Sequence, residues 1–179
     1  FFARPDFVTY ELWRSDGTPE GTWLVKDINP VNPGLFGPGS DIRELTVCGG
    51  KLFFSAFNDA VGQELWVSDG TEEGTILIEI NQAPFTIIGG NGIPENLLCF
   101  KNEVYFQGWN EDESVGVWKS DGTLEGTVEI LPPISFFEDN TSIVNGYLYF
   151  QSVEGLFKTD GATLWLEKAE IGVGAFTAA

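Results

Sequence analysis

Carboxylate and hydroxyl side chains recur in this sequence at a spacing that suits either a backbone turn or a cation site. Three segments read Asp-Gly-Thr-x-Glu-Gly-Thr, and they begin at Asp16, Asp69 and Asp121. An Asp-Gly pair between two strands is a strong hairpin signal. Gly tolerates positive φ, and the Asp carboxylate accepts hydrogen bonds from backbone N–H groups two residues on. We therefore predict structural turns at three pairs: Asp16 and Gly17, Asp69 and Gly70, Asp121 and Gly122.

The alternative for these segments is calcium binding. Glu20, Glu73 and Glu125 each lie four residues after the Asp, with a Thr hydroxyl between. Ca²⁺ takes about 6 to 8 oxygen ligands, so one carboxylate pair per segment leaves most ligands to carbonyls and water. Solvated carboxylates are the ordinary case at a protein surface. We therefore expect no metal and no cofactor, and Ca²⁺ stays open as an alternative.

Catalytic constellations are missing from the sequence. It contains no His, which removes the commonest general base. A sialidase-like site needs an arginine cluster, and the only arginines are Arg4, Arg14 and Arg43. A glycosidase using a pair of carboxylates is a third hypothesis for function, because Asp and Glu are abundant. We expect no enzyme and assign no catalytic residue.

The Asp-Gly segments belong to a longer repeat. Its copies are ELWRSDGTPEGT (11–22), ELWVSDGTEEGT (64–75), GVWKSDGTLEGT (116–127) and a trace, GLFKTDGAT, from residue 155. Successive Asp-Gly pairs are 53, 52 and 39 residues apart. A period near fifty is typical of propeller blades. We predict an all-β, β-propeller-like fold with about four four-stranded blades.

The second copy shows the expected strands most clearly. Segments 42–48, 51–57, 63–69 and 75–80 are rich in β-branched and aromatic residues, and polar or Gly breaks separate them. No segment has an apolar stripe at helical spacing. The apolar positions are crowded rather than alternating, which favours strands covered on both faces.

We expect a single domain over residues 1–179. Its units are 1–28, 42–80, 97–131 and 141–168, and 170–179 is a possible ring-closing strand. The first unit is expected to be truncated, because the opening Phe-Phe-Ala aligns with residues 54–56 inside a strand. A closed four-bladed ring and a part of a larger propeller both stay open.

The repeated motif resembles the ELWxxDGT repeat family of secreted, mostly bacterial proteins. Both complete copies carry the resemblance, at 11–18 and 64–71. The third copy departs from it with Gly116 in place of Glu, and the fourth has Phe157 in place of Trp. The resemblance implies a β-propeller-like module outside the cell or in the cell envelope, with little settled chemistry.

The charge balance limits the partners. The chain has 9 Lys and Arg against 27 Asp and Glu, a net charge of −18. Such a surface repels nucleic acid and anionic lipid headgroups. There is no run of about 18 apolar residues, so we expect no membrane span. We prefer solubility outside the cell as the account of the acidity. Binding of cations or of a basic partner protein is the alternative.

The two cysteines are Cys48 and Cys99. Alignment of the second and third units places Cys99 opposite Val47, one position away from Cys48. Neighbouring positions on a strand point to opposite faces. We therefore expect two buried free thiols and no disulfide.

Aromatic residues recur at one position of the repeat. Trp13, Trp66, Trp118 and Phe157 occupy it, and we expect them in the core between blades. Trp109 lies outside this register, in an acidic loop. It is the candidate ligand-binding residue for an alternative function, a carbohydrate-binding module assisted by Ca²⁺.

Apolar residues in the segments between units supply the candidate partner surface. These crossing loops carry Leu35, Phe36, Phe85, Ile87, Ile88, Phe136 and Phe137. They either complete the core or form a docking face, since clustered exposed apolar residues mark interaction sites. The leading hypothesis is a non-catalytic extracellular scaffold that docks a protein partner, or joins a larger assembly, through these loops.

Overall fold

The computed structural model of the chain describes residues 2–3, 10–30, 39–83, 91–131, 136–152 and 155–169. These residues form fifteen strands and no helix, so the predicted all-β class is confirmed. The described residues accordingly include no helix long and apolar enough to cross a membrane.

The strands build four antiparallel sheets in chain order. The first sheet contains β1 (Phe2–Ala3), β2 (Glu11–Ser15) and β3 (Thr22–Lys26). The second contains β4 (Arg43–Cys48), β5 (Lys51–Asn58), β6 (Gly62–Ser68) and β7 (Ile76–Ile78). The third contains β8 (Glu95–Phe100), β9 (Glu103–Trp109), β10 (Val115–Ser120) and β11 (Val128–Leu131). The fourth contains β12 (Phe136–Val144), β13 (Tyr147–Ser152), β14 (Gly155–Thr159) and β15 (Leu164–Ala169).

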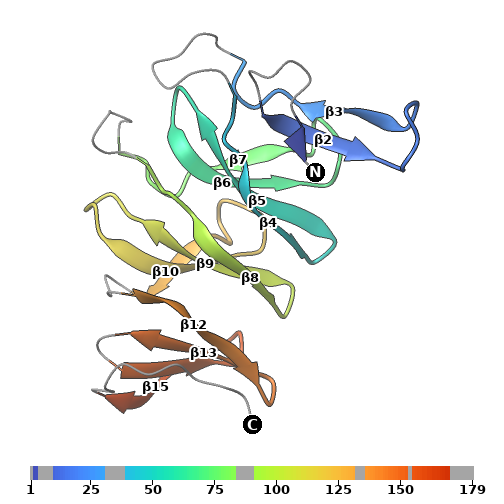
Figure 1. The fold of residues 1–179 in the computed structure, drawn as a ribbon. Coiled ribbons are helices and arrows are strands. Elements are labelled where there is room, and N and C mark those ends of the chain that lie inside the picture. Colours follow the sequence, from blue (N-terminus) through green and yellow to red (C-terminus); the bar gives the residue numbers. More distant parts are fainter. Residues whose placement is uncertain are drawn as a thin grey trace.

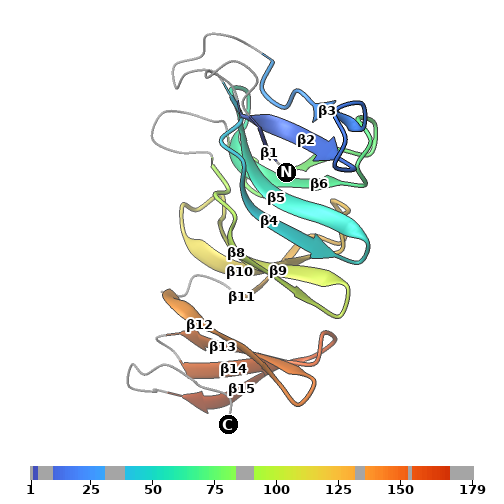
Figure 2. The same cartoon turned by 45° about the vertical axis from the view of Figure 1, so that its right-hand side comes forward.

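The sheets lie one after another in a row. Figures 1 and 2 show the first sheet at one end of the row and the fourth at the other. Each sheet runs from one edge strand to the other in sequence order, so strands that are consecutive in the sequence are neighbours in the sheet. No closed ring is seen among the described residues, and residues 170–179, the possible closing strand, lie outside them.

Consecutive sheets pack face to face through apolar side chains. In β5, Phe54 packs in the cluster that contains Leu12 of the first sheet, whereas its neighbour Phe53 packs with Val104 of the third. Both phenylalanines are completely buried. A strand covered on both sides needs apolar residues at successive positions, which explains the crowded pattern of the second unit.

The recurring aromatics lie in or beside these clusters. Trp66 is buried in the cluster between the first and second sheets. Trp118 packs against the next cluster and stacks on Phe106, with ring centroids 6.5 Å apart. Phe157 packs between the third and fourth sheets, and Trp13 is half-buried in the first.

The expectation of two free thiols is wrong, because Cys48 and Cys99 form a disulfide with a Cα–Cα distance of 5.3 Å. Cys48 belongs to the face of the second sheet that packs on the third, and Cys99 packs from the third sheet against the same cluster. Two equivalent sheets meet through opposite faces. A shift of one residue is therefore what brings the two side chains together, since neighbouring positions point to opposite faces.

The first strand of the fourth sheet begins before the approximate start that we predict for the fourth unit. β12 begins at Phe136, five residues before residue 141. Phe136 pairs with Ser152, and an irregularity in the register separates this pair from the regular pairing that starts at Thr141. Phe136 and Phe137 therefore belong to a strand, not to a crossing loop. The register is irregular between Phe136 and Thr141, which is why the sequence pattern did not indicate that the strand begins at Phe136.

Loss of the disulfide is expected to destabilise the fold. The bridge closes a sequence separation of 51 residues, for which loop-closure entropy predicts about 4 kcal/mol of stabilisation. Urea unfolding of the oxidised protein should therefore show a higher midpoint than unfolding in dithiothreitol. The double variant Cys48→Ala/Cys99→Ala serves as the control, because its midpoint should not respond to reductant. Equal midpoints for the oxidised and reduced protein would contradict the role of the bridge.

Candidate functional site

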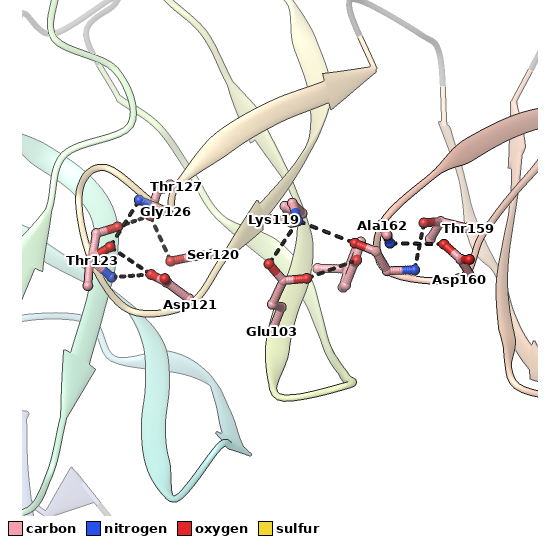
Figure 3. A network of polar contacts seen from close by, with 12 residues as sticks. Glu103, Lys119, Ser120, Asp121, Thr123, Gly126, Thr127, Thr159, Asp160 and Ala162 are labelled. Carbon is pink, nitrogen blue, oxygen red and sulfur yellow. Dashed lines mark hydrogen bonds and ion pairs between the residues drawn. The ribbon is translucent and has the colours of Figure 1, made fainter.

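The Asp-Gly-Thr segments form closed networks of hydrogen bonds. In the second copy, Asp69 Oδ1 accepts hydrogen bonds from the backbone N–H of Thr71 (2.9 Å) and from its hydroxyl (2.7 Å). The Thr71 hydroxyl oxygen in turn accepts one from Gly74 N–H at 2.9 Å. A Cβ at Gly74 would collide with the Asp69 carboxylate. The same bonds occur in the other two copies, and Figure 3 shows the network around Asp121 and Thr123.

The flanking residues complete each turn. Ser68 Oγ lies 2.7 Å from the hydroxyl of Thr75, which donates to the carbonyl of Thr71 at 2.6 Å. These bonds tie β6 to the residue before β7. Hydrogen bonds from Thr71 lower the pKa of Asp69, and the equivalent bonds lower those of Asp16 and Asp121. The Asp side chains are thus engaged with the backbone of their own turns.

The fourth turn is a shortened version. Asp160 Oδ1 accepts a hydrogen bond from the N–H group of Ala162 (2.9 Å), as Figure 3 shows, and another from that of Thr163 (2.8 Å). Its pKa is lowered mainly by these two bonds. The turn therefore keeps the role of the carboxylate without the Thr hydroxyl.

The glutamates of the calcium alternative take no part in these networks. Glu20, Glu73 and Glu125 are exposed. The described residues contain no group of three or more Asp, Glu, Cys or His side chains arranged to hold a metal ion. Nothing in the turn geometry therefore supports Ca²⁺.

Two other glutamates, which the sequence did not single out, are structural. Glu64 is completely buried. Its Oε2 accepts a hydrogen bond from Ile80 N–H (2.8 Å) and its Oε1 one from Gly92 N–H (2.7 Å). Burial raises the pKa of Glu64 to about 8, while bonds from the backbone N–H groups act in the opposite direction. The side chain joins the segment after β7 to the segment that leads into the third sheet.

Glu11 occupies the same position in the first copy. Its Oε2 accepts hydrogen bonds from Ile28 N–H (2.8 Å) and from the Ser40 hydroxyl (2.9 Å). Its pKa is also raised, mainly by burial. The Glu of each complete motif therefore links consecutive units. A signal was present in the sequence, since an acid recurred within an otherwise apolar strand.

The third copy lacks this Glu and replaces its carboxylate from another strand. Gly116 stands at the position of Glu64. A Cβ at Gly116 would collide with the carboxylate of Glu129, which belongs to β11. Asn110 Nδ2 donates to Glu129 Oε1 at 3.4 Å. The absence of a side chain at Gly116 thus creates the space that Glu129 fills.

Glu129 lies in a groove between the second and third sheets, with a volume of about 410 Å³. The groove is lined by Glu79, Ile80, Gln82, Asn110, Glu111, Asp112, Trp118, Leu124, Thr127 and Glu129. Four of these side chains are carboxylates, and none of the described lining residues is Lys or Arg. Trp118, whose Nε1 donates to the Gly108 carbonyl at 3.2 Å, supplies an aromatic wall.

The loop that carries Glu111 and Asp112 is held by Asn110. Asn110 Oδ1 accepts hydrogen bonds from Asp112 N–H and Ser114 N–H, both at 3.1 Å, and from the Ser114 hydroxyl at 2.8 Å. Asn81, in the segment after β7, donates from its Nδ2 to the Asn110 carbonyl at 3.0 Å. Residues of the second and third units therefore jointly fix the position of the acidic loop beside the groove.

The other candidate residues are distributed differently. Trp109 ends β9 beside this loop, with 39% of its surface exposed, but it does not line the groove. The crossing-loop residues Leu35, Phe36, Phe85, Ile87 and Ile88 lie outside the described residues. Sequence reasoning missed the groove, because its walls come from different units and its central carboxylate comes from a position that is Leu77 in the second copy.

Comparison of the chain with protein-family models, with curated proteins and with solved structures gives no match.

The buried carboxyl group of Glu64 makes stability depend on pH. Its pKa rises from 4.5 to about 8 on folding, so the folded state binds the proton more tightly. The resulting stabilisation is complete below pH 4.5 and is lost as the pH rises through 8. Between pH 5 and 9 the free energy of unfolding should fall by about 4 kcal/mol more in the wild type than in Glu64→Gln. Parallel urea-unfolding profiles for the two proteins would contradict this assignment.

The turn network is expected to stabilise its hairpin through the Thr hydroxyl. Thr71→Val removes a group that donates to Asp69 and accepts from Gly74. The free energy of unfolding should fall by about 1 to 2 kcal/mol. Thr71→Ser keeps the hydroxyl and is the matched control, which should lie close to the wild type in urea unfolding. A loss of stability in Thr71→Ser without a loss in Thr71→Val would contradict the role of the hydroxyl.

Proposed function

We propose that this chain is a non-catalytic interaction module that binds a positively charged segment of a partner protein in the groove between its second and third sheets. The main support is the position of the residues that depart from the repeat. Asp112, Gly116 and Glu129 stand where the second unit has Ala60, Glu64 and Leu77. Asp112 and Glu129 line the groove, and Gly116 makes room for Glu129.

The recurring residues have structural roles. The Asp-Gly-Thr turns hold their hairpins, and the motif glutamates link consecutive units. A residue that serves the scaffold of every unit recurs along the chain, as the Asp-Gly pairs do, whereas a residue that serves one binding site need not recur. The convergence of unit-specific residues on one concave surface therefore favours a binding role for that surface.

The chemistry of the groove favours a Lys or Arg side chain as its occupant. Glu79, Glu111, Asp112 and Glu129 offer carboxylates, and their attraction for a cation adds to that of the net charge of −18. The Trp118 ring offers a face for a cation as well. Electrostatic attraction of this kind steers association and weakens with salt.

The setting of the module is proposed on two grounds. The motif resembles the ELWxxDGT repeat family, for which a propeller-like arrangement of the sheets in a secreted protein is expected. The disulfide between Cys48 and Cys99 adds support, because such bonds persist in oxidising compartments such as the extracellular space and the cell envelope.

A carbohydrate-binding function is the second candidate. The observation that favours it is the exposure of Trp109, 39%, beside the polar Asn110 loop. An exposed aromatic ring next to amide and carboxylate groups suits a sugar ring. The lining of the groove by four carboxylates favours a cationic occupant over a neutral sugar.

The proposed binding site is tested with a hexa-arginine peptide as the probe. Fluorescence anisotropy should detect binding that weakens as NaCl rises from 0.05 to 0.3 M. The double variant Asp112→Asn/Glu129→Gln should weaken it by about 1 to 3 kcal/mol, since two carboxylates of the groove lose their charge.

The matched control is Glu20→Gln/Glu73→Gln, which removes the same charge from exposed positions outside the groove. It should change the affinity much less. Equal losses in both double variants would show attraction by net charge alone. Binding of glycans that disappears in Trp109→Ala, without binding of the peptide, would favour the carbohydrate function instead.

A further inference from the structure

At every junction between consecutive described sheets, a cationic side chain contacts the Asp-Gly turn of the following sheet. Arg14 Nη1 donates to the Gly70 carbonyl at 3.1 Å. Lys51 Nζ donates to the Asp121 carbonyl at 3.1 Å. Lys101 Nζ donates to the Asp160 carbonyl at 2.7 Å. The direction is the same each time, from one sheet to the next along the chain.

Two more cations reinforce these contacts. Lys26 Nζ donates to the carbonyls of Glu72 (3.2 Å) and Thr75 (2.9 Å) in the second turn. Lys119 Nζ donates to the Gly161 carbonyl at 3.4 Å in the fourth, and Figure 3 shows Lys119 between Glu103 and this turn. At least five of the nine Lys and Arg residues of this acidic chain are therefore used at the junctions.

The first turn is an acceptor that receives no such cation from the described residues. A methyl group at Gly17 would meet no atom within 4 Å. At the equivalent glycines it would meet Arg14 Nη1 at 3.2 Å (Gly70) and Lys51 Nζ at 2.9 Å (Gly122). The backbone of the first turn thus presents the surface that the other turns present to a preceding sheet.

The fourth sheet carries the corresponding donor. Lys158 pairs across the hairpin with Trp165, in the register that pairs Arg14 with Trp23. Its Nζ lies 2.7 Å from Glu167 Oε1 and 5.0 Å from the centre of the Tyr147 ring. Trp165 is 37% exposed beside it. No following turn is present among the described residues.

We propose that two copies of this chain associate head to tail, with Lys158 of one copy donating to the carbonyls of the Asp16–Thr18 turn of the other. The contact continues the interface that already joins the four sheets, and it matches a cation to carbonyl oxygens of an unoccupied acceptor.

Salt is expected to strengthen this association. Each copy carries a net charge of −18, so the two copies repel each other at long range, and this repulsion is screened by salt. The dependence is opposite to that expected for a cationic peptide in the groove. The two proposals can therefore fail separately.

Sedimentation equilibrium of the wild-type chain in 0.15 and 0.5 M NaCl tests the proposal. We expect a concentration-dependent dimer or larger species, more abundant at the higher salt concentration. Lys158→Glu should raise the dissociation constant by about tenfold or more, because a charge-assisted hydrogen bond is lost. Lys158→Arg should retain association, since Arg14 makes this contact in the first sheet.

Arg43→Glu is the matched control. Arg43 lies in the second sheet, where its side chain pairs with Asp41, and the variant changes the net charge by the same amount as Lys158→Glu. It should associate like the wild type, and circular dichroism should show that all variants are folded. A chain that is monomeric in both salt concentrations, or a dimer that Lys158→Glu and Arg43→Glu weaken equally, would overturn the proposal.

Discussion

The burial of apolar side chains between consecutive sheets is the constraint on which this structure depends. Each inner sheet has apolar side chains on both faces, as Phe53 and Phe54 show by packing in opposite directions. A sheet of four short strands with one such face exposed to water would be poorly stable alone. The repeat therefore specifies a sheet together with the surface on which the next sheet packs.

Polar contacts fix how the packed sheets are oriented. Apolar packing is not directional, whereas the bonds from Glu64 to Ile80 and Gly92 hold the connection between two units in one geometry. The cations at the turns act at the other end of the sheets. At least five of the nine Lys and Arg residues of the chain donate hydrogen bonds to backbone carbonyls of these turns.

Local features of the fold were predictable from the sequence, because their causes lie within a few residues. The strands of the second unit lie within about two residues of their expected bounds, and the Asp-Gly pairs occur in turns whose hydrogen bonds are all local. Features that depend on contacts between two units could not be predicted from the sequence. To predict the disulfide, one must know that equivalent sheets meet through opposite faces. To predict the role of Glu64, one must know which distant N–H groups approach it.

The groove could not be predicted from single positions of the sequence either. Gly116 alone predicts only a missing side chain, and Glu129 alone predicts an exposed acid on an outer strand. Their relation becomes visible when β10 and β11 are paired, because Trp118 then stands opposite Glu129 and the carboxylate reaches the space beside Gly116. Repeat proteins allow this kind of change, since the remaining copies keep the scaffold while one copy diverges.

The disulfide joins the same two sheets that form the walls of the groove. It connects β4 and β8, the first strands of these sheets, whereas residues of the groove follow β7 and lie on β10 and β11, towards the opposite edge. This covalent link keeps the two sheets from separating. If the groove binds a partner as proposed, the partner meets two sheets that are already joined, and less of its binding energy is consumed in ordering the protein.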